Sequence, residues 1–321
     1  MKKLLLATAI PALSVSAAHA APQVYGKAFL TLDYVDADNN NESTSLNSNS
    51  SRIGVKGAER LTANTDLVYQ LEYRVDIDSD KQRNFESRDT YLGLSNKQYG
   101  TVLAGRLSTI DGMVDYANVA SGGVVGGDGI LSTFDAPRAS NAIAYVSPNY
   151  NGVNFLGMYG LDSDQDSGVN SSTVDAVNAE SKWGLGVQYE PANQPFRAGA
   201  TYIQAGDVKI ARVSGAYDIN SALTVGALYQ NTDLKQAKKE NTFTASAQMK
   251  TATPWSVYGQ FDLQQNVKGA KDADNQRIIA GGKYAFNQAT TGHVYAGYIN
   301  HDSGSKDTKE YGVGAGLEYN F

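Results

Sequence analysis

The chain ends with Tyr311-Gly312-Val313-Gly314-Ala315-Gly316-Leu317-Glu318-Tyr319-Asn320-Phe321, and this stretch decides the fold class. Every second residue from Tyr311 to Phe321 is apolar or aromatic, whereas the residues between them are glycine, glutamate or asparagine. Successive side chains of a β-strand point to opposite faces, so strict alternation predicts a strand whose two faces meet different surroundings.

The same two-residue period recurs along the chain, in segments 182–189, 243–249, 255–264 and 277–286 among others. No comparable run has helical spacing. The pattern predicts an all-β protein of sixteen strands of roughly ten residues each. We expect their centres near residues 29, 55, 70, 91, 103, 142, 157, 185, 200, 213, 226, 245, 260, 281, 296 and 315. Short turns alternate with longer polar linkers such as 36–48, 78–86 and 162–180, which predicts an up-and-down sheet with unequal edges.

Composition excludes several classes of function. The 321 residues contain no Cys, which removes disulfide scaffolds, thiol nucleophiles and Cys-bearing zinc sites. Only three His occur, so a multi-histidine metal centre is not expected. The net charge of −6 and the pI near 5.1 argue against a nucleic-acid binder. Mean hydropathy is −0.37, and past the N-terminal region no apolar run is long enough for a membrane helix.

The first twenty residues have the form of an export signal. Lys2 and Lys3 precede a short apolar stretch at 4–15, and Ala18-His19-Ala20 has the small-x-small form that signal peptidase cleaves after. We therefore expect residues 1–20 to be a cleaved signal peptide and 21–321 to form one β-barrel domain.

The alternation alone leaves two classes open. A secreted sandwich buries its apolar face, whereas a transmembrane barrel turns that face to lipid and lines its lumen with polar groups. Closure of the sheet favours the barrel, because an open sheet of this size would expose aggregation-prone edges. Small or aliphatic residues at mid-strand suit contact with lipid. Aromatic residues cluster at strand ends, as in an interfacial girdle: Tyr189, Tyr217, Tyr284, Phe286, Tyr319 and Phe321.

Together, several segments resemble the general (diffusion) porins of the Gram-negative outer membrane. The segments that carry the resemblance are 24–27, 51–57, 88–94, 99–106, 138–148 and 317–321. Their order and spacing, which extend over residues 23–321, make the resemblance specific, although each segment alone is weak.

The resemblance implies a closed antiparallel sixteen-stranded transmembrane barrel with short periplasmic turns and long extracellular loops. It also implies a homotrimer in the outer membrane, in contact with lipid and lipopolysaccharide. Such a barrel is a water-filled channel for passive diffusion of small hydrophilic solutes and ions. No enzymatic activity, cofactor, metal or nucleic-acid partner is expected. The third extracellular loop, here 107–137, would fold into the lumen and narrow it, and its glycines suit tight turns.

The resemblance also assigns residues to a constriction. Lys27, Arg52, Arg88 and Arg138 would form a charge ladder on the wall. Alternation supports an inward position, because Arg52 is out of phase with the apolar Ile53 and Arg88 shares a face with Thr90. An arginine facing lipid at mid-strand would cost about 2–4 kcal/mol.

The acidic side of the constriction departs from the family pattern. Loop 107–137 offers Asp111, Asp115, Asp128 and Asp135, but its centre at 118–127 has no carboxylate. We expect Asp111, Asp115 and Asp128 to face the ladder. The ion preference stays open at this stage. The terminal Phe321 resembles the assembly signal of outer-membrane barrels.

Alternative functions remain at this point. Phe29 and Tyr258 face the lumen by phase and would guide a particular solute in a substrate-selective porin. A barrel-borne hydrolase or adhesin is a further alternative, with His293 as the residue to test for hydrolysis. His293 and His301 share one face of a predicted strand, but the mature chain offers no third His or Cys for a metal site. A secreted β-rich binding protein would be soluble without detergent.

Overall fold

The computed structural model describes residues 21–38, 41–78, 85–123, 125, 127–161 and 182–321. The expected signal peptide, residues 1–20, and the expected loop 162–180 lie outside the described residues. Within the described part, no helix combines the length and the apolar character needed to cross a membrane.

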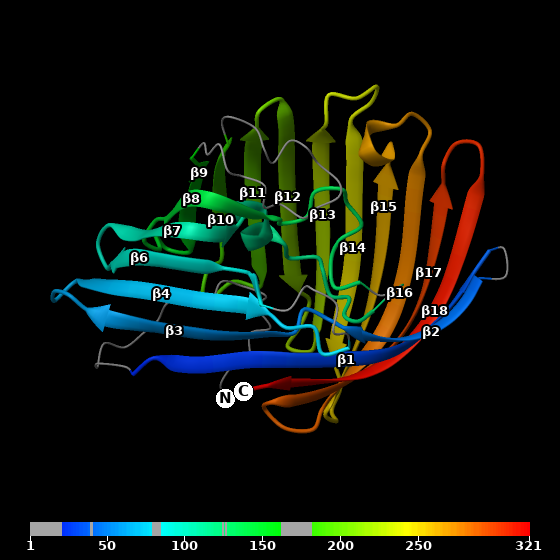
Figure 1. Ribbon diagram of the computed structural model, residues 1–321, viewed down its shortest axis with the longest axis horizontal. Coiled ribbons are helices and arrows are strands. Elements are labelled where there is room, and N and C mark those ends of the chain that lie inside the picture. The colour runs from blue at the N-terminus through cyan, green and yellow to red at the C-terminus, as the bar shows by residue number, and fades with distance from the viewer. Residues whose placement is uncertain (1–20, 39–40, 79–84, 124, 126, 162–181) are drawn as a thin grey trace.

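Strands make up nearly all of the described chain (Figure 1). Their bounds are β1 Gln23–Ala37, β2 Asn41–Ser48, β3 Arg52–Arg60, β4 Thr65–Arg74, β5 Glu86–Ser87, β6 Thr90–Asn96, β7 Gly100–Ser108, β8 Arg138–Val146, β9 Val153–Gly160, β10 Lys182–Tyr189, β11 Phe196–Ala205, β12 Val208–Asp218, β13 Leu223–Asp233, β14 Glu240–Lys250, β15 Trp255–Gln265, β16 Asp274–Ala285, β17 Thr290–Asp302 and β18 Asp307–Asn320. Two short 3₁₀ turns are η1 (Ile110–Val114) and η3 (Val267–Gly269).

The strands form one closed antiparallel barrel. Each strand pairs with its neighbour in sequence, and β18 closes the ring on β1, from Lys27 opposite Asn320 to Ala37 opposite Glu310. β2 and β3 both pair with β1, and β5 and β6 both pair with β4, so each of these pairs is one interrupted strand. The eighteen segments therefore make sixteen spanning strands. This confirms the predicted barrel, and every predicted centre falls inside a strand.

Irregular backbone occurs at three places on one side of the wall. β2 and β3 are separated at Ser50, which has a φ of 54°, and β5 and β6 are separated at Arg88. The register between β7 and β8 shifts after Gly105, and the extra residue is on β8, where Asn141 has a φ of 48°. Bulges of this kind re-aim neighbouring side chains. Here they lie beside Arg52, Arg88 and Arg106.

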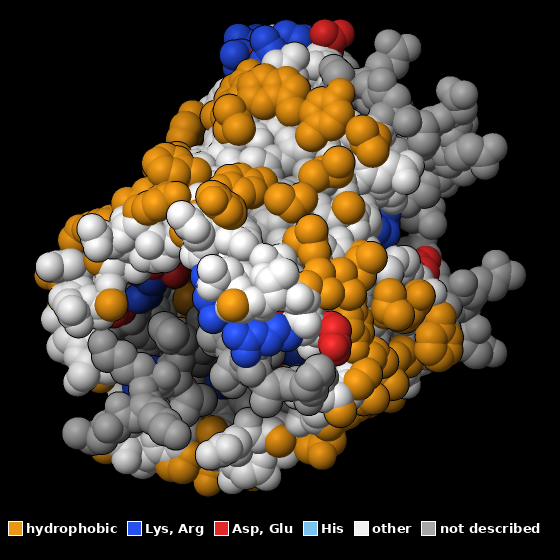
Figure 2. Space-filling model, turned by 90° about the vertical axis from the view of Figure 1, so that its left-hand side faces the viewer, with side chains coloured by type: hydrophobic (Ala, Val, Ile, Leu, Met, Phe, Trp, Pro, Cys, Tyr) orange, Lys and Arg blue, Asp and Glu red, His pale blue; other side chains and the backbone are white. Residues whose placement is uncertain are grey.

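The barrel is apolar outside and polar inside. Ile278, Val313 and Leu317 are 57%, 54% and 52% exposed, whereas Thr244 and Asp262 are fully buried. Figure 2 shows hydrophobic side chains over the outer surface and, at one open end, a hollow that contains Lys, Arg, Asp and Glu side chains. A secreted sandwich would have the opposite arrangement, so that alternative is wrong.

One predicted loop is mostly strand. Segment 36–48 is polar and was expected to be a linker, yet Leu30–Ala37 pairs residue by residue with 41–48. Polar side chains on the inner face bond to one another, as Asn47 Nδ2 donates to Asp33 Oδ2 over 2.8 Å. The polar composition therefore reflects a hairpin with a hydrogen-bonded inner face, not a loss of strand.

A charge on the outer face should destabilise the barrel according to its depth. Ile278 and Gln276 both point outward from β16, but Ile278 is nearer the middle of the strand. Ile278→Arg is expected to lower the free energy of unfolding in lipid vesicles by about 2–4 kcal/mol, and Gln276→Arg by about 0–1 kcal/mol. Denaturant titration measures both values. Equal costs would contradict this placement of the membrane midplane.

Candidate functional site: a charged constriction in the lumen

The connection between β7 and β8, residues 109–137, folds into the barrel and is called loop three here (Figure 1). Its backbone amides are held by side chains of distant strands. Tyr116 N donates to Ser214 Oγ over 3.0 Å, and Gly123 N donates to Tyr295 Oη over 2.6 Å. The loop therefore lies along the inner face of the wall from β12 to β17. This confirms the predicted infolded loop.

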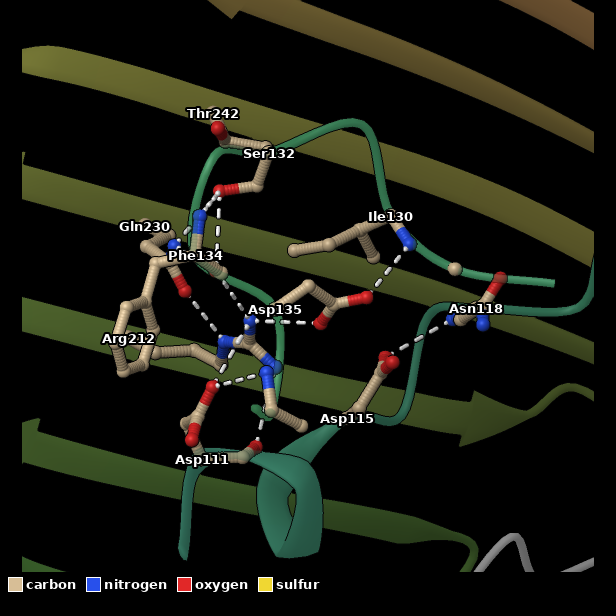
Figure 3. A network of polar contacts seen from close by, with 12 residues as sticks. Asp111, Asp115, Asn118, Ile130, Ser132, Phe134, Asp135, Arg212, Gln230 and Thr242 are labelled. Carbon is tan, nitrogen blue, oxygen red and sulfur yellow. Dashed lines mark hydrogen bonds and ion pairs between the residues drawn. The ribbon is translucent and has the colours of Figure 1, made fainter. Parts of the chain in front are cut away.

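One arginine holds both ends of loop three (Figure 3). Arg212 of β12 is fully buried, and its Nη2 lies 3.4 Å from Asp111 Oδ2 and 3.0 Å from Asp135 Oδ1. Its Nη1 donates to the Asp111 carbonyl oxygen over 3.1 Å, and its Nε donates to Gln230 Oε1 over 2.7 Å. Arg212, Asp111 and Asp135 are called the clasp here. Because Asp111 starts the loop and Asp135 ends it, the clasp closes the base of the loop.

Two further anchors hold the middle of the loop. Arg277 of β16 donates to the Gly129 carbonyl oxygen over 2.6 Å and is paired with Asp262 at 2.8 Å. Glu240 of β14 accepts from Thr133 N over 2.9 Å. Hydrogen bonds to charged groups contribute about 1.5–3 kcal/mol each when they are buried. Loop three is thus fixed at several independent points.

The clasp holds more negative than positive charge. Burial raises the pKa of Asp135 to about 6, although the Arg212 guanidinium beside it acts in the opposite direction. In an open loop this carboxyl group would titrate near 3.9. Between about pH 4 and 6 the closed clasp therefore binds more protons than the open one, so closure is favoured as the pH falls and weakened as it rises.

We therefore expect fluctuations of loop three to depend on pH. Current noise through a single channel should decrease when the pH falls from about 7.5 to about 5, and Asp135→Asn should be quiet at both values. Asp218→Asn, in an exposed pair with Arg197, is the matched control and should keep the dependence. An Asp135→Asn channel that still responded to pH as the unmodified one does would contradict this assignment.

The wall opposite the anchored loop carries the predicted ladder. Lys27, Arg52 and Arg138 lie on β1, β3 and β8, and Arg88 lies in the break between β5 and β6. Each has partners on its own side of the barrel. Lys27 Nζ lies 5.3 Å from the centroid of the Phe29 ring.

Wall carboxylates compensate the arginines of this ladder. Glu72 Oε1 lies 2.6 Å from Arg88 Nε and 3.6 Å from Arg52 Nη1. Asp89 Oδ1 lies 2.8 Å from Arg138 Nε. The partners of these arginines are therefore carboxylates of the wall itself.

The three acids expected to face the ladder occupy different places. Asp111 is fully buried in the clasp, and its Oδ1 has no hydrogen-bond partner among the described residues. Asp115 accepts from the backbone N–H groups of Ala117 and Asn118 and so stabilises a turn of loop three. Asp128 alone of the three is exposed, and it accepts from Ser50 Oγ over 3.2 Å.

Sequence reasoning missed Glu72, Asp89, Arg106, Arg212 and Arg277. The signal was present, because Arg212 and Arg277 stand out of phase with the outward Val213 and Ile278, just as Arg52 does with Ile53. The rule that identified Arg52 applied equally to these residues. Alternation could not show that Arg212 and Arg277 bind loop three and do not line the open lumen.

The lumen aromatics are covered. Phe29 is 1% exposed and Tyr258 is 5% exposed. Lys27 lies over the first ring and Lys283 Nζ lies 5.1 Å from the centroid of the second. At these two positions the lysine ammonium groups, and not the aromatic rings, face the lumen. Phe29 and Tyr258 therefore do not present exposed rings that could guide a particular solute.

The two histidines of β17 lie apart. His293 is packed against the Phe29 ring with Nε2 3.3 Å from Glu318 Oε2, and His301 Nδ1 lies 2.9 Å from Asn275 Oδ1. Neither contact involves a nucleophilic hydroxyl. Among the described residues there is no group of three or more His, Cys, Asp or Glu side chains arranged to hold a metal ion.

The C-terminus takes part in the closure of the barrel. Phe321 and Gly26 exchange two backbone hydrogen bonds, of 2.9 and 3.1 Å. The Phe321 ring occupies the space where a Cβ on Gly26 would lie. The residue expected to be an assembly signal thus also completes the β1–β18 seam.

Comparison with known proteins agrees with this geometry. The family model described as Gram-negative porin matches residues 7–304. The major outer membrane protein P.IB of Neisseria sicca is 25% identical, with all of both chains covered. An anion-selective porin from Comamonas acidovorans has a TM-score of 0.73 at 19% identity, covering 94% of this chain and 99% of that one. The trimer form of OmpT from Vibrio cholerae has a TM-score of 0.66 at 17% identity, with 94% and 99% covered.

Proposed function

The chain belongs to the Gram-negative porin family, and from that premise we propose the constriction and the ion preference of its channel. It is an outer-membrane barrel whose water-filled lumen allows passive diffusion of small hydrophilic solutes and ions. What a porin admits is set by the narrowest part of the lumen and by the charges that line it.

The constriction lies between the charge ladder and loop three. Lys27, Arg52, Arg88 and Arg138 border it on the wall, and Asp128 borders it from the loop. Asp111 and Asp115 act differently, since one is in the clasp and the other stabilises a turn of the loop. The fixed loop supports this proposal, because a loop pinned at its base and its middle keeps the opening narrow.

The channel prefers anions. Along the wall from β3 to β8, the ladder arginines Arg52, Arg88 and Arg138, together with Arg106, outnumber Glu72 and Asp89, the carboxylates that pair with them. This surplus is the single observation that carries the proposal, because rings of fixed charge set the ion preference of a pore. The low-dielectric wall strengthens their field. The structurally similar Comamonas protein is described as anion-selective, which supports the same preference.

The zero-current potential across a KCl gradient tests this proposal. Purified protein in planar bilayers should give the sign of chloride preference, and the preference should weaken as the salt concentration rises, because salt screens the wall charges. A potential of the opposite sign, with normal channel formation, would contradict the surplus of positive charge at the constriction.

The assembly and processing of the chain follow from the same reading. We propose a homotrimer, which the trimeric Vibrio relative supports, with outer surfaces against lipid and lipopolysaccharide. Closure in three equal conductance steps would show it. We also propose that residues 1–20 are removed on export and that the barrel acts without catalysis.

A further inference from the structure

A buried histidine lies on the inner wall beyond the charge ladder. His293 is 3% exposed, its ring centroid lies 4.5 Å from that of Phe29, and neither ring nitrogen has a hydrogen-bond partner of standard geometry among the described residues. Its Nε2 lies 3.3 Å from Glu318 Oε2. An imidazole changes its charge between pH 5 and 8, unlike other side chains in ordinary surroundings.

The carboxylate beside His293 reaches the lumen. The Glu318 side chain is 22% exposed, whereas that of His293 is 2% exposed. Lys27 of β1 and Lys283 of β16 both interact electrostatically with Glu318 and with Asp128 of loop three. Lys283 is also the β16 residue directly opposite His293. Glu318 and His293 therefore face two lysines and one loop carboxylate.

The lysine on β16 extends the line of cations past the seam of the barrel. Lys283 Nζ donates to the Val119 carbonyl oxygen of loop three over 3.2 Å. The ladder thus continues from Lys27 on β1, across β18 and β17, to Lys283. Glu318 is the wall carboxylate that offsets this part of the line, as Glu72 offsets Arg52 and Arg88.

We propose that His293 is a proton-dependent specificity residue of the channel, which controls how far Glu318 offsets Lys27 and Lys283. When His293 is neutral, the charge of Glu318 acts on the lumen and reduces the anion preference. When His293 is protonated, it forms a charge-assisted pair with Glu318. The two lysines are then uncompensated, and the anion preference rises. This inference rests on the proposed channel function.

The chain contains its own control. His301 is the other histidine of the mature chain, lies on the same strand, and contacts Asn275 and Glu310 near the opposite end of that strand. Only these two histidines lie after residue 20. The substitutions His293→Gln and His301→Gln therefore show which of them causes a change in selectivity between about pH 5 and 8. Asp135→Asn removes the clasp carboxyl that titrates in the same range.

The experiment measures the chloride-to-potassium permeability ratio in planar bilayers from about pH 8 to about pH 5. The unmodified protein should show a rise of roughly twofold as the pH falls, because one wall charge is neutralised. His293→Gln should stay at the alkaline value, whereas His301→Gln and Asp135→Asn should keep the rise. Glu318→Gln should begin at the acid value of the unmodified protein, because the carboxylate that offsets the two lysines is gone.

Each outcome is decisive. A His293→Gln channel that kept the rise would overturn the proposal, as would a rise lost in His301→Gln. If His293→Gln failed to fold, as judged by heat-modifiable mobility on a gel, the Glu318→Gln arm alone would decide. Failure to form channels would count against the proposed function, whereas normal channels with a flat pH response would count only against the role of His293.

Discussion

Replacing Arg212 with methionine is expected to release loop three from the wall. Asp111 is fully buried and Asp135 largely so, and both depend on the Arg212 guanidinium. Removing one partner of a buried ion pair costs about 3–5 kcal/mol, because the other charge is left uncompensated. Loop three should then open locally more often. Its backbone amides should exchange about a hundredfold faster or more, as a loss of that free energy implies. Hydrogen exchange of residues 110–135, followed by mass spectrometry, measures this directly.

An exposed ion pair provides the control for Arg212. Arg197 and Asp218 have side chains that are 30% and 38% exposed, so Arg197→Met should change stability by about 0–1 kcal/mol and leave exchange of loop three unchanged. Addition of Asp135→Asn to Arg212→Met should restore part of the protection, because one buried charge is gone. Unaltered exchange in Arg212→Met would show that the clasp does not hold the loop.

Neutralising the ladder is expected to reverse the ion preference, not only to abolish it. Replacing Arg52, Arg88 and Arg138 together with glutamine leaves the charges of Glu72 and Asp89 without their arginine partners. Removing the cations therefore changes the local surplus to a deficit. Fixed charges at a constriction determine which ion enters, so the zero-current potential should change sign.

The converse variant tests the same balance. Glu72→Gln with Asp89→Asn frees the arginines from their wall partners and should raise the chloride-to-potassium ratio severalfold. Asp218→Asn, which also alters an arginine-bound carboxylate but on β12, should have a small effect. Matching potentials in the glutamine triple variant and the unmodified protein would place the constriction elsewhere.

The fold could be predicted from the sequence because the two-residue period is a local property. Each strand reveals itself by its own alternation, as in 311–321, and short turns allow only an up-and-down order. The prediction failed for segment 36–48, where polar residues pair as a hairpin through bonds such as that between Asn47 and Asp33. Polarity there marks hydrogen bonding inside the lumen, which composition cannot distinguish from exposure in a loop.

The site could be predicted only on the side where it lies on strands. Alternation predicted that Arg52 lies on the inner face, because phase within a strand is fixed. Nothing local marks Arg212 as the partner of Asp111, since the two residues meet only when loop three folds back across the barrel. The same long-range closure buries Asp111, which the sequence could only present as one loop carboxylate among several.

The most direct test of the central claim, that lipid meets the outer apolar face and water fills the inner polar one, is single-channel conductance in a series of salt concentrations. The account predicts ohmic openings whose conductance rises with bulk salt, as expected for a wide aqueous pore. Protein that is monodisperse without detergent and gives no conductance steps would contradict it.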